Sequence, residues 1–116
     1  MQLFKVTTEH GADVIDPMDA LQRLASPVPP VILDLRTENE FLAGHIPGAR
    51  WLPADDLCSE IASLPADREY MMVCRSGARS GVAAWQLRAA GYSVSSLCGG
   101  LLAWQRAGGP IEHHNN

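Results

Sequence analysis

Short apolar runs alternate along the chain with segments whose apolar residues recur every three or four positions. Mostly apolar runs of four or five residues, typical of strands buried on both faces, lie at residues 31–35 and 70–73, and residues 94–97 are expected to form a last strand. The helical period occupies residues 17–24, 37–42, 55–64, 80–90 and 101–107. Because parallel strands need crossover connections that are usually helices, this alternation predicts a single α/β domain with a central, mostly parallel sheet and helices on both faces.

Local signals mark several of the predicted helix ends. Asp16 followed by Pro17 is typical of a helix start, and Thr37 and Glu40 have the spacing of a capping box. Gly91 is expected to stop the helix before it, since glycine readily adopts the left-handed conformation found there. We expect an N-terminal arm or short strand over residues 1–12, the domain over residues 13–111, and a disordered tail over residues 112–116.

Composition and charge narrow the function classes. The 116-residue chain has nine Lys and Arg against thirteen Asp and Glu, and a formal net charge of -4. An acidic chain argues against a dedicated nucleic-acid binder. No apolar run approaches the roughly 18 residues of a membrane span, and the N-terminus lacks the apolar segment of a secretory signal. We therefore expect no nucleic-acid or membrane partner and a cytoplasmic location.

The cysteines are few and odd in number: Cys58, Cys74 and Cys98. No two of them have the C-x-x-C spacing of a zinc site, so the sequence predicts neither a metal nor another cofactor. A disulfide framework would leave one thiol over, which favours a reducing compartment. Cys58, within a helical pattern, is expected to be inert.

Cys74 stands out because it ends a buried strand and opens a small, glycine-containing loop that leads directly into a helix. Successive backbone N–H groups in such a turn form an anion-binding nest, and the helix N-terminus adds partial positive charge. Arg75 and Arg79 place two permanent cations there. We therefore expect Cys74 to have a lowered pKa and to be largely thiolate near neutral pH. The alternative, a structural cysteine before an ordinary turn, fits this composition poorly.

Three separated blocks of the sequence carry a family pattern. The first runs from Leu33 to Ala49 and has the form D-x-R…E-F…G-H-I-P-G-A; the second is the loop from Cys74 to Ser80; the third, from Gly99 to Pro110, has the form G-G…A-W…G-P. In this order and spacing they resemble the rhodanese-like sulfurtransferases in their small single-domain form. The resemblance covers about residues 13–111.

The resemblance implies a two-step covalent mechanism. The Cys74 thiolate would attack the outer sulfur of a donor such as thiosulfate, and the resulting persulfide would pass its sulfur to cyanide or a thiol acceptor. The cationic side chains suit a dianionic donor. The backbone amides implied to cradle the persulfide belong to Arg75, Ser76, Gly77, Ala78, Arg79 and Ser80.

Two other functions remain open at this point. Related cysteine-loop phosphatases and arsenate reductases use a C-x5-R spacing, whereas Cys74 and Arg79 form a shorter C-x4-R ring that suits a single sulfur atom better. The other alternative is a persulfide carrier that delivers sulfur to a protein partner, and no sequence feature separates it from a small-molecule enzyme.

Several further residues allow a functional and a structural interpretation. Asp34 and Arg36 either border the pocket or brace the loop, with Arg36 paired to Glu40; the pairing is favoured because charges near a strand end need partners. Cys98 would lie at the same sheet edge as Cys74, either as a resolving thiol or as a small space-filling residue. His45 reads as part of a packed turn, since an ionised thiolate needs no base. The tryptophans are expected in the core or a pocket wall: Trp51, Trp85 and Trp104.

Overall fold

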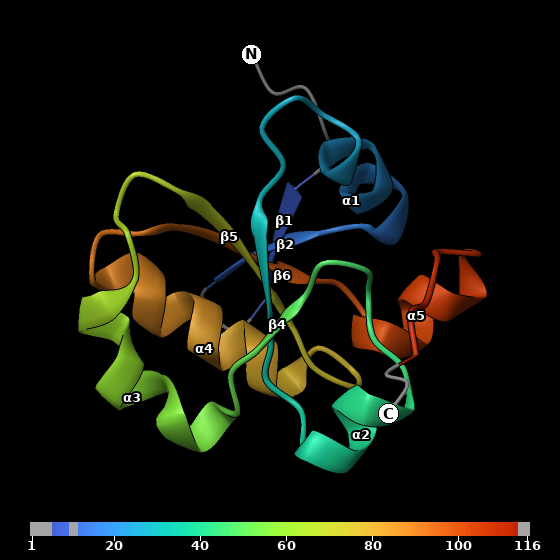
Figure 1. Ribbon diagram of the computed structural model, residues 1–116. Helices are drawn as coiled ribbons and strands as arrows, with labels where there is room; N and C mark the ends of the chain where they lie inside the picture. The colour runs from blue at the N-terminus through green and yellow to red at the C-terminus, as the bar shows by residue number, and fades with distance from the viewer. Residues whose placement is uncertain (1–5, 10–11, 114–116) are drawn as a thin grey trace.

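The computed structural model describes residues 6–9 and 12–113. Its described residues form one six-stranded sheet in the order β1–β2–β6–β5–β3–β4 (Figure 1). Only β1 runs antiparallel to its neighbour, and the other five strands are parallel, which confirms the predicted α/β class with a mostly parallel sheet. The strands are β1 (Val6–Glu9), β2 (Ala12–Ile15), β3 (Val31–Asp34), β4 (Arg50–Trp51), β5 (Glu69–Val73) and β6 (Ser93–Leu97).

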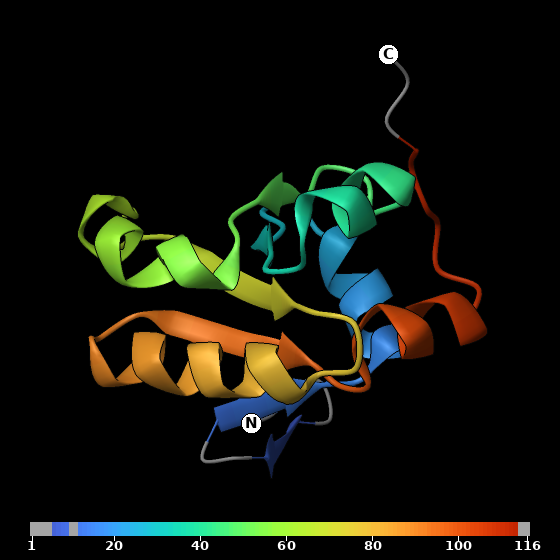
Figure 2. The same ribbon diagram turned by 90° about the horizontal axis from the view of Figure 1, so that it is seen from below.

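Helices cover both faces of this sheet, as predicted. One face carries α3 (Leu57–Glu60) and α4 (Ala78–Ala89), and the other carries α1 (Pro17–Leu24) and α5 (Gly100–Arg106), as the two views in Figures 1 and 2 show. The short helix α2 (Glu38–Ala43) follows β3. Its capping box is present: the Thr37 side chain accepts from the Glu40 backbone N–H, and the Glu40 side chain accepts from the Thr37 backbone N–H.

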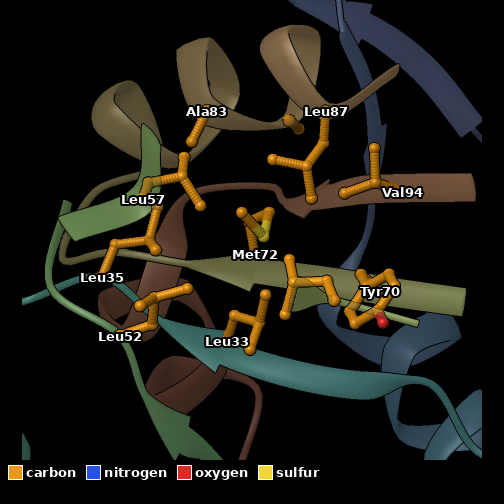
Figure 3. Close-up of a cluster of buried hydrophobic side chains, with 11 residues drawn as sticks. Leu33, Leu35, Leu52, Leu57, Tyr70, Met72, Ala83, Leu87 and Val94 are labelled. Carbon is orange, nitrogen blue, oxygen red and sulfur yellow. The ribbon is translucent and has the colours of Figure 1, made fainter. Parts of the chain in front are cut away.

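Each central strand supplies side chains to both halves of the core, because neighbouring residues of a strand point to opposite faces. Leu33 and Met72 lie in the cluster under α3 and α4, shown in Figure 3. Ile32 and Met71, one position earlier on the same strands, pack under α1 and α5. The apolar runs seen in the sequence are therefore double-sided core strands.

The segment predicted as one helix over residues 55–64 is broken, so that prediction was wrong in detail. It consists of a 3₁₀ turn (Ala54–Asp56), the single α-helical turn α3 and a second 3₁₀ turn (Ile61–Ser63). The Tyr92 hydroxyl lies 2.7 and 3.0 Å from the carbonyl oxygens of Ile61 and Leu64. These tertiary contacts satisfy the carbonyls where the helical ladder stops, while Leu57 and Leu64 still reach the core.

The tryptophans separate into one core residue and two that lie farther out than the sequence predicts. Trp104 is completely buried, as expected, and its indole N–H donates to the carbonyl of Pro110 at 2.9 Å. Trp51 is 36% exposed and Trp85 is 52% exposed. Trp85 points away from the core because α4 turns the opposite stripe to the sheet; that stripe consists of Ser80, Ala83, Ala84 and Leu87.

The last described residues pair with the loop after α2 instead of beginning a loose tail at residue 112. The backbone of Glu112 exchanges two hydrogen bonds with His45, at 2.7 and 2.9 Å. A ring nitrogen of His113 lies 2.8 Å from the carbonyl oxygen of Ala43. This backbone pairing is a long-range contact that the polar composition of the segment does not predict. Residues 114–116, the rest of the predicted tail, lie outside the described residues.

Candidate active site

The chemistry-bearing residues gather at one edge of the sheet, where the parallel strands end. Val73 at the end of β5 is in register with Asp34 at the end of β3, and Met72 is in register with Ser96 on β6. Cys74 therefore leaves the sheet between the segment that contains Arg36 and the segment that contains Cys98. Parallel α/β sheets characteristically form their sites at this edge.

Residues 74–79, here termed the Cys74 loop, wrap around the cysteine sulfur. The backbone N–H of Gly77 donates to Cys74 Sγ at 3.1 Å and that of Ser80 donates at 3.4 Å. Gly77 has φ +100°, a left-handed conformation that a residue with a Cβ adopts only with strain, and it directly precedes α4. The sulfur therefore lies at the N-terminus of α4, among N–H groups that helix geometry leaves without partners.

These hydrogen-bond donors lower the pKa of the Cys74 thiol against the opposite effect of burial. Burial, with Cys74 only 1% exposed, raises its pKa. Hydrogen bonds from the Ser80 side chain and from the backbone N–H groups of Ser80, Gly77 and Ser76 outweigh burial, so that the pKa of Cys74 lies below its ordinary value. The Ser80 hydroxyl is itself held 2.7 Å from Ser96 Oγ on β6. Hydrogen bonding to the charged form, more than the charge of the nearby arginines, is thus the main cause of the lowered pKa of Cys74.

The turn between β6 and α5 lies directly against the Cys74 loop. The N–H of Leu101 donates to the carbonyl of Cys74 at 2.9 Å, and that of Leu102 donates to the carbonyl of Arg75 at 3.2 Å. In Figure 2 the loop that follows β5 turns into α4 beside this connection. A Cβ on Gly100 would come within 2.5 Å of the carbonyl oxygens of Cys74 and Arg75, so only glycine permits the approach. The glycine pair was visible in the sequence as a motif, but its supporting role was not.

The two arginines of the loop lie on its outer side. Arg75 and Arg79 are exposed, as are Ser76 and Ala78, whereas Gly77 and Ser80 are buried with the sulfur. Arg75 borders a pocket of about 260 Å³ between α2 and α5, and Arg79 borders a smaller pocket on the other side of Arg36. Of the predicted loop, the Gly77 and Ser80 N–H groups are therefore directed at the sulfur, while the side chains of Arg75 and Arg79 are exposed.

The expected pairing of Arg36 with Glu40 is replaced by a different one. Arg36 Nε and Nη2 donate to the two carboxylate oxygens of Asp34 at 2.9 and 2.8 Å, and Nη2 also donates to the carbonyl of Gly44 at 2.7 Å. Asp34 is 1% exposed and Arg36 is 5% exposed. Arg36 borders both pockets, and Asp34, its ion-pair partner, borders neither of these two.

The remaining candidates lie around this centre. Cys98 is partly buried at the end of β6, the neighbour of β5, and its N–H donates to the carbonyl of Ile15 at 2.9 Å. Cys58 is exposed on α3. The His45 ring stacks on Phe41 at 3.9 Å between centroids, with Nδ1 2.8 Å from the Phe41 carbonyl oxygen, which makes it part of a packed turn.

Two further features are missing from the described residues. No group of three or more of their His, Cys, Asp or Glu side chains is placed to hold a metal ion. Within the described part of the chain, no helix has the length and apolarity needed to cross a bilayer.

A cysteine whose sulfur accepts two backbone hydrogen bonds, at the end of a parallel strand and the start of a helix, is the candidate reactive group of this α/β domain. Residues 16–107 match the sequence profile of the rhodanese-like domain, and the chain belongs to this family. It is 41% identical over 98 residues to a sulfurtransferase of Allochromatium vinosum, covering 84% of this chain and 92% of that one.

Two further comparisons agree with this membership. The chain is 40% identical over 77 residues to the thiosulfate sulfurtransferase GlpE of Shewanella oneidensis, covering 66% of this chain and 76% of that one. The crystal structure of a rhodanese-related protein from Thermoplasma volcanium superposes with a TM-score of 0.79 at 25% identity, covering 85% of this chain and 96% of that one. The family and its named members support sulfur transfer as the general chemistry of this protein.

Proposed function

We propose that this protein is a thiosulfate-type sulfurtransferase whose nucleophile is Cys74. The observation that carries the proposal is the set of N–H donors around Cys74 Sγ, from Gly77 at 3.1 Å and Ser80 at 3.4 Å. Donors in this arrangement stabilise a negative sulfur before the reaction, and a persulfide carries the same charge one atom further out. Backbone N–H groups that converge in this way bind anions.

The proposed reaction has two displacement steps. In the first, Cys74 Sγ⁻ attacks the outer sulfur of thiosulfate, an S–S bond forms to Cys74, and the S–S bond of the donor breaks with its electron pair leaving on sulfite. In the second, an acceptor nucleophile, cyanide or a thiolate, attacks the outer persulfide sulfur and Sγ leaves as thiolate. No external oxidant or reductant is needed in either step, and the free enzyme is regenerated.

Charge around the loop supports an anionic donor. Arg75 and Arg79 are exposed on either side of a thiolate in a chain whose formal net charge is -4. Their fixed positive charges offset the repulsion between a thiolate and a dianion, and guanidinium groups bind oxyanions through charge-assisted hydrogen bonds. The Shewanella oneidensis relative named a thiosulfate sulfurtransferase supports the same choice of donor.

A thiosulfate-to-cyanide assay with Cys74→Ser tests the proposal. We expect thiocyanate formation by the wild type and its loss in Cys74→Ser, together with a one-sulfur mass adduct on the wild type after thiosulfate alone. Cys58→Ser is the matched control, because it makes the same change at an exposed cysteine on α3. Activity that survives in Cys74→Ser would refute the assignment of the nucleophile.

A second candidate function, delivery of the persulfide sulfur to a protein partner, is favoured by one observation. Val82 and Trp85 are 49% and 52% exposed on the outer face of α4, the helix that begins at the Cys74 loop. Exposed aromatic and aliphatic side chains of this kind are common at protein interfaces. Wild-type protein that forms the one-sulfur adduct but turns over neither cyanide nor small thiols would favour this carrier function over the enzyme.

A further inference from the structure

Arg36 is a buried cation with unused hydrogen-bond donors. Its Nε and Nη2 atoms are occupied by Asp34 and by the carbonyl of Gly44, whereas Nη1 has no partner among the described residues. Only 6% of the side chain is exposed. Since no fully buried polar side-chain atom in the described part of the chain lacks a partner, Nη1 keeps some contact with solvent, and the side chain borders two pockets.

The larger of these pockets combines that cation with apolar walls. It holds about 260 Å³, just below the range of roughly 300 to 1,000 Å³ common for drug-sized ligands, which limits it to small molecules. Leu101, Leu102 and Ile111 contribute apolar surface, and Arg75, the residue after the nucleophile, links the pocket to the Cys74 loop. An inorganic oxyanion has no apolar surface to bury against these side chains, whereas the carbon chain of an organic anion does.

One acidic side chain also borders the pocket. Glu40 is engaged in its capping box, where Oε1 accepts from the Thr37 N–H at 3.0 Å and from Thr37 Oγ1 at 3.1 Å. Its Oε1 atom is therefore directed toward Thr37. Arg36 and Arg75 leave the pocket with two guanidinium groups against one engaged carboxylate.

We propose that this pocket is a subsite for the carboxylate of a small organic thiol, the sulfur acceptor. Arg36 Nη1 donates to the carboxylate, Arg75 adds positive charge, and the carbon chain of the acceptor lies against Leu101, Leu102 and Ile111. Arg36 is a binding residue held rigid by Asp34, so little conformational entropy is lost when the carboxylate binds. This inference rests on the proposed function, and it names the class of acceptor.

The bound acceptor reacts by the second displacement step of the proposed mechanism. Its thiolate attacks the outer sulfur of the Cys74 persulfide, a new S–S bond forms on the acceptor, and the bond from that sulfur to Cys74 Sγ breaks. The electron pair stays on Sγ, and the products are an organic persulfide and the free Cys74 thiolate. The carboxylate takes no part in the bond changes and contributes only binding and orientation.

Gln105 offers a test that leaves the buried ion pair intact. It is exposed on α5 and borders the pocket. With thiosulfate as donor, two acceptors are compared at constant pH: mercaptopropionate, which carries a carboxylate, and mercaptoethanol, which is the neutral thiol. For each acceptor the measured quantity is the ratio of the variant KM to the wild-type KM. This ratio cancels the intrinsic reactivity of each thiol.

We expect Gln105→Glu to raise the KM for mercaptopropionate about two- to fivefold and Gln105→Lys to lower it by a similar factor, the range that exposed charge pairs produce. The KM for mercaptoethanol should stay unchanged in both variants. Gln22→Glu, on α1 and outside the pocket, makes the same charge change and should alter neither value.

Three outcomes would overturn the subsite. The first is an equal change in the KM for both thiols, and the second is a Gln22→Glu effect as large as that of Gln105→Glu. The third is a change in the KM for thiosulfate and not in that for the acceptor, which would assign the pocket to the donor. The one-sulfur adduct formed from thiosulfate alone is measured on every variant. If the wild type forms no adduct, the proposed function itself is refuted. If the adduct forms but the acceptor KM does not change with the charge at position 105, only the subsite is refuted.

Discussion

Gly100 lies against the backbone of Cys74 so closely that a single methyl group would not fit between them. An added Cβ would stand 2.5 Å from the carbonyl oxygen of Cys74, and the residue itself has φ +62°. The nucleophile loop is thus supported from the turn after the next strand of the sheet. Its shape depends on a residue 26 positions away in the sequence.

We predict that Gly100→Ala destabilises the fold and distorts the Cys74 loop. The left-handed backbone alone costs about 1 kcal/mol for alanine, and the clash with backbone oxygens adds to it. Gly91→Ala is the matched control, because Gly91 has φ +98° but nothing within 4 Å of its Cβ position. Chemical denaturation should give a clearly larger loss of unfolding free energy for Gly100→Ala than for Gly91→Ala. Equal losses would show that the close approach of Gly100 to the Cys74 loop does not contribute to the cost of the substitution.

The reactivity of Cys74 should depend on pH in a direction set by its hydrogen bonds. Because its pKa is lowered in the folded state, alkylation of Cys74 should reach half its maximum rate below the ordinary thiol value of about 8.5. Ser80→Ala removes a hydroxyl that helps to lower the pKa of Cys74 and should move the midpoint upward. Ser63→Ala, at an exposed hydroxyl on the far 3₁₀ turn, should leave it in place. A midpoint unmoved by Ser80→Ala would contradict the role given to that side chain.

The same lowered pKa makes stability depend on pH. The folded chain releases the Cys74 proton at a lower pH than the unfolded chain does, so the free energy of unfolding rises with pH between the folded and the unfolded pKa. The stabilisation is complete above the unfolded value and is lost as the pH falls through the folded value. Replacement by Cys74→Ala should remove this rise, which denaturation at several pH values would detect.

The buried pair of Asp34 and Arg36 should be sensitive to the loss of either partner. Asp34→Asn leaves a guanidinium with 6% exposure and no counter-charge, and we expect a loss of about 3 kcal/mol or more in unfolding free energy. The control is Glu69→Gln, which removes the carboxylate from a partly exposed ion pair with Arg23 and should cost about 1 kcal/mol or less. Similar losses for the two variants would argue against an energetic difference between buried and exposed pairs here.

Trp104 and Trp85 should respond very differently to the same substitution. Trp104→Ala removes a completely buried ring and should cost about 3 to 5 kcal/mol. Trp85→Ala removes a ring that is 52% exposed, so its effect should stay within about 0.5 kcal/mol. A large loss at Trp85, measured by denaturation of the isolated protein, would mean that the ring has a packing role that its exposure does not indicate.

Much of the site was predictable because its parts are close together in the sequence. The loop from Cys74 to Ser80 contains its own amide donors, its own cations and the glycine that turns it into α4. The central strands were predictable for the same reason, since residues 31–33 and 70–73 are short apolar runs, whereas β2 (Ala12–Ile15) and β4 (Arg50–Trp51) were not predicted. Local backbone geometry and burial on both faces leave such segments few alternatives.

Three features depended on how the segments compete and pack. Arg36 pairs with Asp34 instead of Glu40, whose Oε1 accepts from Thr37 in the capping box. Trp85 faces outward because the sheet takes the opposite stripe of α4. Glu112 is held by His45 through a backbone bridge that has no sequence signal.

The amino-acid sequence by itself therefore determined the class of the fold, the candidate nucleophile and the direction of its pKa shift, because strand runs and the Cys74 loop are local. Only the tertiary structure decided that Gly100 lies against the loop and that Arg36 pairs with Asp34 at the border of a pocket. The physical reason is that close backbone approach and the choice among competing ion-pair partners depend on distances between segments, which the order of residues leaves open until the sheet has assembled.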